Sequence, residues 1–106
     1  MINAQMKKGL LDVCVLATLN RGESYGYRIL KDLPQCLEVS ESTLYPILRR
    51  LEGSNCLSSH SVEHEGRLRK MYQITPEGKR QILSFLEDGR EFQEILRYIK
   101  EGAEHE

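Results

Sequence analysis

The chain has 106 residues, of which 40% are hydrophobic and 29% are charged, and this composition is typical of a single soluble globular domain. The longest apolar run, residues 13–17, is too short to span a bilayer, and residues 1–8 lack the apolar segment of a signal peptide. We therefore expect a cytoplasmic protein without membrane contact.

The net charge of −1 is unevenly distributed along the chain. Residues 1–80 carry 12 Lys and Arg against 9 Asp and Glu, whereas residues 81–106 carry 3 against 7. The acidic part is therefore the C-terminal segment. This asymmetry permits a basic, nucleic-acid-binding surface on the first eighty residues.

The cysteines and histidines form no pattern that predicts a disulfide framework or a metal site. Cys14, Cys36 and Cys56 are odd in number and widely spaced, so we expect buried, reduced thiols. No Ser/His/Asp or Cys/His set and no Gly-rich phosphate loop is visible, and a chain of this length has little room for a catalytic pocket. We therefore expect no enzymatic activity, no metal and no other cofactor.

Residues 7–20 are predicted to form a helix that is apolar over much of its circumference. Its apolar residues are Leu10, Leu11, Val13, Leu16, Ala17 and Leu19. A helix of this kind is buried on more than one side. In a small domain we expect it to contact both the chain's own core and a second subunit.

A second helix is predicted over residues 24–33, with Ser24 as its N-cap and Pro34 after its end. Gly26 lies in its first turn, where a missing side chain permits close approach of another backbone or of a phosphate. The linker of residues 35–39 then leads to a third helix, which is helix-turn-helix spacing. The expected inner face of the second helix consists of Tyr25, Ile29, Leu30 and Leu33.

The third helix is predicted over residues 40–52, beginning at Ser40 or Ser42. If it begins at Ser42, Pro46 lies within about the first turn, where little bonding is lost. Its buried stripe is expected to contain Leu44, Ile47, Leu48 and Leu51. The opposite face carries Ser42, Thr43, Tyr45, Arg49 and Arg50. Hydroxyls can reach base edges and guanidinium groups can reach phosphates, so this face suits the major groove of DNA; the alternative is an ordinary amphipathic surface helix.

Two strands are predicted at residues 57–63 and 68–75, joined by a hairpin turn at residues 64–67 that contains Gly66. The expected inner face of the second strand consists of Leu68, Lys70, Tyr72 and Ile74. Positive charge at one end of the hairpin comes from Arg67, Arg69 and Lys70. A basic hairpin directly after three helices predicts a winged helix, with the hairpin as a wing against the phosphate backbone or the minor groove.

A long C-terminal helix is predicted to run to about Lys100, with Thr75 as N-cap and Pro76 and Glu77 in the first turn. About 25 helical residues extend roughly 37 Å, which is more than the small domain can cover. We therefore expect a homodimer through this helix and the first one. Gly89 interrupts the apolar stripe and marks a bend or a close crossing. The stripe consists of Ile82, Phe85, Leu86, Phe92, Ile95, Leu96 and Ile99.

Three segments, Tyr25–Tyr27, Ser42–Glu52 and Arg69–Gly78, together resemble the PadR family of bacterial transcription regulators. The resemblance extends over nearly the whole chain. It implies a mainly α fold with a small β-hairpin, in which residues 1–75 form a winged helix-turn-helix and residues 76–106 form a dimerisation helix with an acidic tail. It also implies a homodimer that represses transcription at a palindromic operator in double-stranded DNA. In several members a small aromatic or drug-like ligand relieves repression.

The resemblance also implies roles for individual residues. Ser42, Thr43 and Tyr45 would face the major groove, and Arg49 and Arg50 would face phosphates. Tyr25 would contact the DNA backbone, and the wing contacts would come from Arg67, Arg69 and Lys70. Two alternatives stay open, since Tyr25 can pack in the core and Tyr45 can pack against the Pro46 segment. Dimer contacts are assigned to Leu10, Val13, Phe85, Leu86, Phe92, Leu96 and Ile99.

Relatives that bind flat aromatic compounds commonly use an aromatic residue, often Trp, in the C-terminal helix, and this chain contains no Trp. Phe85, Phe92 and Tyr98 are the aromatic candidates, and dimer packing explains them equally well. No ligand site is therefore assigned. The leading hypothesis is a DNA-binding repressor. The alternative is a winged-helix protein-interaction module without DNA binding, which the net charge favours.

Overall fold

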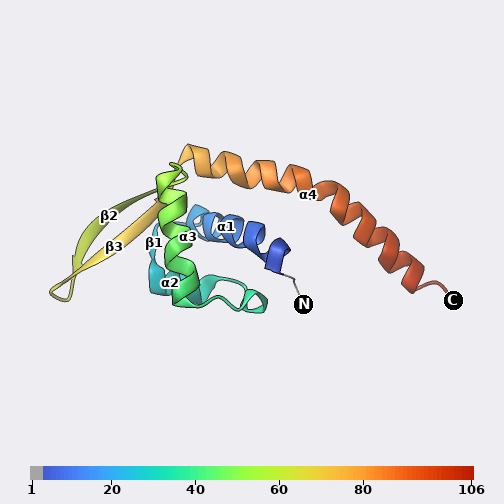
Figure 1. Ribbon diagram of the computed structural model, residues 1–106, viewed down its shortest axis with the longest axis horizontal. Helices are drawn as coiled ribbons and strands as arrows, with labels where there is room; N and C mark the ends of the chain where they lie inside the picture. Colours follow the sequence, from blue (N-terminus) through green and yellow to red (C-terminus); the bar gives the residue numbers. More distant parts are fainter. Residues whose placement is uncertain (1–3) are drawn as a thin grey trace.

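The computed structural model describes residues 4–106, with side chains from residue 9 onward. This part of the chain forms four α-helices, a short 3-10 helix and a three-stranded antiparallel sheet (Figure 1). The arrangement confirms the predicted winged helix-turn-helix with a long C-terminal helix. The elements are α1 (Ala4–Asn20), β1 (Ser24–Tyr25), α2 (Gly26–Asp32), η1 (Gln35–Leu37), α3 (Glu41–Gly53), β2 (Leu57–His64), β3 (Arg67–Ile74) and α4 (Pro76–Ala103).

The hydrophobic core lies where α1, α2 and α3 meet the base of the sheet. The predicted stripe of α3 is buried as expected, whereas Ala17 of α1 is exposed. Burial of each large aliphatic side chain contributes roughly 1.5–3 kcal/mol, so this cluster is the main source of stability. Its buried members are Leu11, Val15, Leu16, Leu19, Ile29, Leu33, Leu37, Leu44, Ile47, Leu48, Leu51, Cys56, Leu57 and Tyr72.

The predicted start of the second helix is wrong by one residue, because the N-cap is Tyr25 and not Ser24. Ser24 does not cap the helix, because Ser24 and Tyr25 form strand β1 and pair with Tyr72 and Met71 of β3. The sheet takes up the backbone hydrogen bonds of this segment, and the helix begins at Gly26. The sheet therefore has the order β1-β3-β2 and is larger than the predicted hairpin.

Helix α3 has Ser40 at its N-cap position, which is the earlier of the two predicted starts. Its first residue is Glu41, so Pro46 lies inside the helix and not in its first turn. Proline lacks the N–H that would bond to the carbonyl of Ser42. Both residues are exposed, so water can satisfy that carbonyl.

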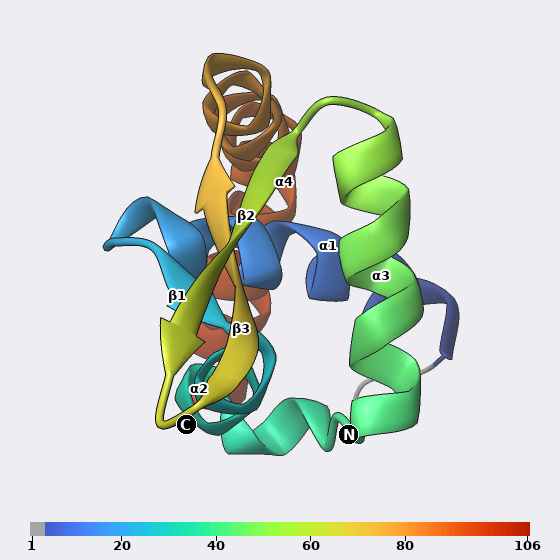
Figure 2. The same cartoon turned by 90° about the vertical axis from the view of Figure 1, so that its left-hand side faces the viewer.

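The wing is a tight hairpin whose outer half projects from the domain (Figure 1) and points toward the viewer in Figure 2. Glu65 and Gly66 form a two-residue turn with φ of 52° and 79°, which is typical of a type I′ turn. Tyr72 at the base is buried, but Leu68 near the tip is 79% exposed and Lys70 is also exposed. The predicted inner face is thus buried only near the base of the wing, because the helices do not extend beneath its outer half.

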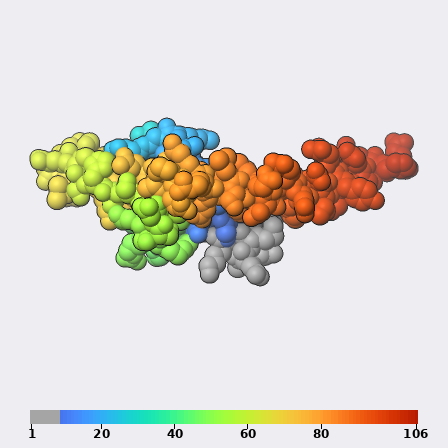
Figure 3. Space-filling model, turned by 90° about the horizontal axis from the view of Figure 1, so that it is seen from above, coloured from blue at the N-terminus to red at the C-terminus, as the bar shows by residue number. Residues whose placement is uncertain are grey.

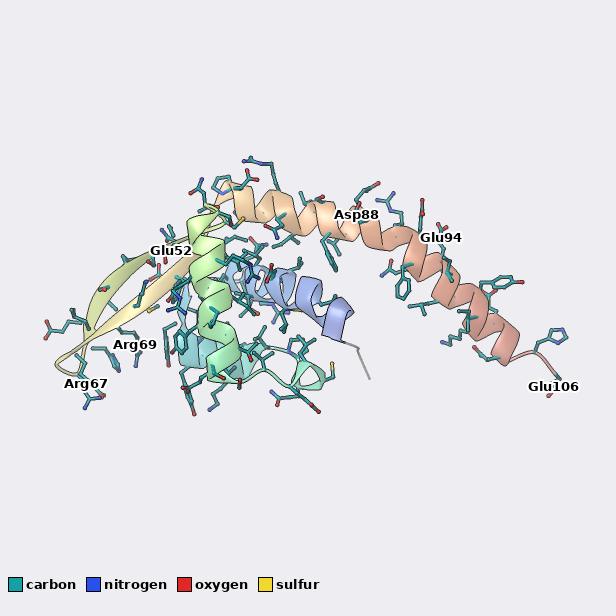
Figure 4. The ribbon with its side chains drawn as sticks, in the orientation of Figure 1. Glu52, Arg67, Arg69, Asp88, Glu94 and Glu106 are labelled. Carbon is teal, nitrogen blue, oxygen red and sulfur yellow. The ribbon has the colours of Figure 1, made fainter. Side chains whose placement is uncertain are left out.

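The C-terminal helix α4 begins as predicted and ends three residues later than expected. The N–H of Gly78 donates to the hydroxyl of Thr75 at 3.1 Å, which is the expected N-cap. Figure 3 shows the helix running along the molecule and projecting at one end, and the overall extents are 63 × 25 × 22 Å. It bends near Asp88, next to Gly89, which agrees with one of the two roles predicted for that glycine (Figure 4).

The cysteines differ in burial, although all three are free thiols in the described chain. Cys56 is buried and Cys14 is half-buried, and burial raises the pKa of the Cys14 thiol. Cys36 is exposed, so its expected burial is wrong. It lies on η1, where the neighbouring Leu37 fills the core instead.

Two further findings concern the described residues. Within residues 4–106, no helix combines the length and the apolar character that crossing a membrane requires. The same part of the chain contains no group of three or more His, Cys, Asp and Glu arranged to hold a metal ion.

We predict that Gly78→Ala destabilises the fold. A Cβ at Gly78 would overlap the carbonyl oxygen of Cys56 and lie 2.7 Å from Cγ1 of Ile74. The backbone oxygen cannot move aside cheaply, so we expect a loss of about 1–3 kcal/mol in the free energy of unfolding. Chemical denaturation at one fixed protein concentration measures this loss.

Gly102→Ala is the matched control, because a Cβ there would meet no described atom within 4 Å. Alanine is the better helix former, so its effect should be stabilising and below about 1 kcal/mol. Equal stability of the two variants would contradict the close packing at Gly78.

Candidate nucleic-acid interface

The exposed face of α3 carries short hydroxyl groups at its start. Ser42, Thr43, Tyr45 and Arg49 are exposed, because the apolar stripe occupies the opposite side of the helix. The Ser40 hydroxyl lies 3.0 Å from the Ser42 hydroxyl and 3.1 Å from the Thr43 hydroxyl. These hydroxyls can both donate and accept, so they can contact base edges or phosphates.

A broad groove of about 810 Å³ lies between α3, the start of α2 and the wing. Three of its lining residues are basic and four are tyrosines, and none of the described lining residues is acidic. Such a surface attracts a polyanion and offers phenol groups for hydrogen bonds to phosphate. The lining residues are Tyr25, Gly26, Tyr27, Tyr45, Arg49, Arg69, Lys70 and Tyr72.

The close approach predicted at Gly26 is made by a side chain. A Cβ at Gly26 would lie 2.6 Å from the hydroxyl oxygen of Tyr45 and 2.9 Å from its ring, so the tyrosine packs on the first turn of α2. This contact differs from the two alternatives weighed for Tyr45. The side chain is still 43% exposed and can reach a ligand in the groove.

The three basic residues of the wing lie on both faces of β3, although Arg69 and Lys70 line the same groove. Alternation along β3 places Arg67 and Arg69 on one face and Lys70 on the other. The guanidinium of Arg69 lies 3.9 Å from the centre of the Tyr25 ring, which is a cation–π contact. Tyr25 is therefore half-buried beside the wing and is not a core residue.

Lys70 forms an ion pair with Glu52, which lies in the last turn of α3. Its ammonium lies 3.4 Å from one carboxylate oxygen of Glu52, and the hydroxyl of Ser59 donates to the other at 2.5 Å. The Ser59 hydrogen bond, together with Lys70, holds the pKa of the Glu52 carboxyl below its usual value against the opposing effect of burial. Burial raises the pKa of the Tyr72 hydroxyl from its ordinary value.

Arg50 points toward the body of the domain. Its guanidinium pairs with the carboxylate of Asp12 on α1, so it joins α3 to the first helix. Arg49 lines the groove instead. The two adjacent arginines, which have equivalent predicted roles, therefore lie in different surroundings.

Tyr27 and Lys31 belong to the same surface and were not among the predicted contact residues. Tyr27 is exposed and lines the groove, and the ammonium of Lys31 lies 5.2 Å from the centre of its ring. Their spacing of four residues on α2 places them on one helix face. The four-residue spacing of Tyr27 and Lys31, directly after Gly26, is the sequence signal that could have identified them as candidate contact residues.

The predicted dimer residues form an apolar surface on α1 and α4. Leu10, Val13 and Phe85 are half-buried. Leu86, Phe92, Leu96 and Ile99 are 48–60% exposed. A pocket of about 420 Å³ lies between the two helices, lined by Leu10, Phe85, Leu86, Asp88, Gly89, Phe92 and Gln93. A row of large exposed apolar side chains of this length is typical of an interaction surface.

Comparison with known proteins gives consistent matches. The model of the transcriptional regulator PadR-like family matches residues 15–84. A transcriptional regulator from Mycobacterium tuberculosis is 39% identical over 67 residues, which cover 63% of this chain and 60% of that protein. A transcriptional regulator from Clostridium thermocellum has a similar structure, with a TM-score of 0.78 and 29% identity over 90% of this chain and 97% of that one. A PadR-like transcriptional regulator from Bacillus cereus has a TM-score of 0.75 and 27% identity, over 97% of this chain and 100% of that one.

Proposed function

The chain belongs to the PadR-like family of transcriptional regulators, and from this premise we propose that it is a homodimeric repressor acting at an operator with two-fold symmetry. Membership of the family makes it a DNA-binding regulator and not an enzyme. The observation that carries the finer proposal is the basic, tyrosine-lined groove between α3 and the wing. A bacterial regulator meets its DNA in the cytoplasm, and we place it there.

In this proposal α3 lies in the major groove. Its exposed hydroxyls at Ser42 and Thr43, with Tyr45, face the base edges, and Arg49 faces a phosphate. The groove between α3 and the wing then holds the DNA backbone, which Tyr25 and Tyr27 flank. The winged helix-turn-helix of residues 1–75 thus acts as the DNA-binding domain.

The wing supplies the second set of contacts. Arg67 is exposed near the tip, and Arg69 is held by stacking on Tyr25, so both can neutralise phosphates beside the major-groove site. Lys70 also lines the groove, where its ion pair with Glu52 leaves it half-exposed, whereas Arg50 is not among the lining residues. We leave Arg50 out of the contact set, because its pairing with Asp12 gives it a structural partner.

Residues 76–106 serve as the dimerisation helix with an acidic tail. The exposed stripe of α4 requires a second apolar surface, and a second copy of the chain supplies an identical one. A small aromatic effector is the remaining part of the proposal. It is supported by the pocket between α1 and α4, where Phe85 and Phe92 offer aromatic surface.

The experiment that tests the proposal is a fluorescence-anisotropy titration. The protein is titrated against DNA from immediately upstream of its own gene at two salt concentrations, with random duplex of equal length as control. Binding that exceeds the control and weakens with salt is the expected result. Equal, weak binding to both duplexes would contradict a sequence-specific role at that site and favour a protein-interaction module.

We predict that Arg69→Ala weakens DNA binding mainly by removing a phosphate contact. The slope of log K against log salt should become shallower by about 0.9, the value expected for one phosphate contact. The matched control is Arg80→Ala on α4, because Arg80 pairs with Glu77 on the same helix. An unchanged slope for Arg69→Ala would show that Arg69 does not contact a phosphate.

We predict that Leu96→Glu disrupts the dimer. A carboxylate buried in an apolar interface without a partner is strongly unfavourable, so the dimer dissociation constant should rise by more than about tenfold. Tyr98→Glu is the matched control, because Tyr98 lies about 200° around α4 from Leu96 and is 79% exposed. Sedimentation equilibrium at micromolar concentration measures both. A wild-type protein that sediments as a monomer would contradict dimerisation through α4.

A further inference from the structure

The carboxylate of Glu52 connects the recognition helix to both strands of the wing. Glu52 lies in the last turn of α3, where Figure 4 shows it at the junction of the helix and the hairpin. One oxygen accepts a hydrogen bond from Ser59 of β2 at 2.5 Å, and the other lies 3.4 Å from the ammonium of Lys70 on β3. One side chain thus contacts each of the two wing strands.

A negative charge at this position is unfavourable in two respects. It lies near the C-terminal end of α3, where the helix dipole disfavours an anion. It also lies beside a groove that attracts a polyanion, so it repels the phosphates that the groove is suited to bind. The carboxylate nevertheless has two partners on the wing, the Ser59 hydroxyl and the Lys70 ammonium, and both lower its pKa from the usual value. Two wing contacts made by one carboxylate at an otherwise unfavourable position indicate a positional role.

The wing needs support at the point where Glu52 holds it. Within residues 4–106, strand β1 pairs with β3 only at Tyr72 and Met71, so the sheet narrows to two strands at Lys70. From Lys70 to the turn at Gly66 the ribbon extends about 13 Å at roughly 3.3 Å per residue. A tilt of about 10° at its base would therefore move the tip by roughly 2 Å. Such a shift is enough to break a hydrogen bond to a phosphate.

Lys70 is held on the α3 side by a second contact. Its ammonium lies 5.5 Å from the centre of the Tyr72 ring, in addition to its ion pair with Glu52. Tyr72 lies two residues further along the same strand and is buried in the core, so this contact restrains the Lys70 side chain. The link between α3 and the two wing strands is made by Glu52 itself.

We propose that Glu52 is a positioning residue that sets the angle between the wing and the recognition helix, so that both contact one DNA site at the same time. This inference rests on the DNA-binding mode proposed above. For the removal of Glu52, this role predicts a change in DNA affinity opposite to the change that charge alone predicts. Removing an acidic residue beside bound DNA should strengthen binding, whereas loss of the wing angle weakens it.

The test compares Glu52→Ala with Glu41→Ala, an acidic residue exposed in the first turn of the same helix. We expect Glu52→Ala to weaken operator binding by about fivefold or more, and Glu41→Ala to leave it unchanged or slightly tighter. Glu52→Gln keeps an acceptor for Ser59 and loses the ion pair with Lys70, so it should fall between wild type and Glu52→Ala. It also serves as the second variant if the alanine variant does not fold.

Two further readouts separate a positioning role from a merely destabilising one. In hydroxyl-radical footprints of the operator, Glu52→Ala should lose the protection given by the wing and keep the protection given by α3. In addition, the effects of Glu52→Ala and Arg67→Ala should not be additive, because both act through the wing tip. Thermal unfolding of each variant establishes that the fold is intact.

The outcomes distinguish the two proposals. If the wild-type protein does not prefer operator to random duplex, the proposed function fails. If the wild type binds specifically and Glu52→Ala binds as tightly or more tightly, the positioning role of Glu52 is wrong. The same conclusion follows if the effects of Glu52→Ala and Arg67→Ala on affinity are fully additive and the wing footprint stays intact. In both cases the proposed function stands.

Discussion

Burial of Leu44, Leu48 and Leu51 determines how α3 is rotated about its axis, and the rest of the proposed DNA-binding surface follows from that rotation. Once these leucines pack against the core, the hydroxyls of Ser42 and Thr43 must lie on the open side of the helix. The wing follows α3 after three residues, so its base is placed by the same packing. Gly78 completes the arrangement, because its lack of a side chain lets α4 start against the carbonyl of Cys56.

Features with a local cause could be predicted from the sequence, whereas features that depend on distant partners could not. The α3 stripe follows from helical periodicity, and the Thr75 cap follows from short-range chemistry. Strand β1 has two residues and no local pattern, and it exists because β3 passes beside it. The exposure of Leu68 likewise depends on where the helices end, since strand alternation alone predicts an inner face. The same holds for Arg50, whose orientation depends on Asp12 of α1.

A net charge of −1 is compatible with binding a polyanion because the charges are separated in space. Arg67 lies at the tip of the wing, whereas Glu94 and Glu106 lie on the projecting half of α4 and at its end (Figure 4). The molecule is 63 Å long, and charges in physiological salt are screened over about 8 Å. The acidic tail therefore has little effect on the potential of the groove, and regional charge is a better guide to binding than net charge.

The bend of α4 near Asp88 bears on the spacing of DNA half-sites. In a two-fold dimer, recognition helices reach successive major grooves when they are about 34 Å apart. In a pair joined through α4, that separation depends on the direction in which α4 leaves the winged domain and on its bend. The buried Gly78 determines the direction in which α4 leaves the winged domain, and the segment around Gly89 determines the bend. In the proposed dimer, base recognition by α3 and half-site spacing are thus controlled by different parts of the chain, so a change in α4 is expected to alter spacing without altering the bases that α3 contacts.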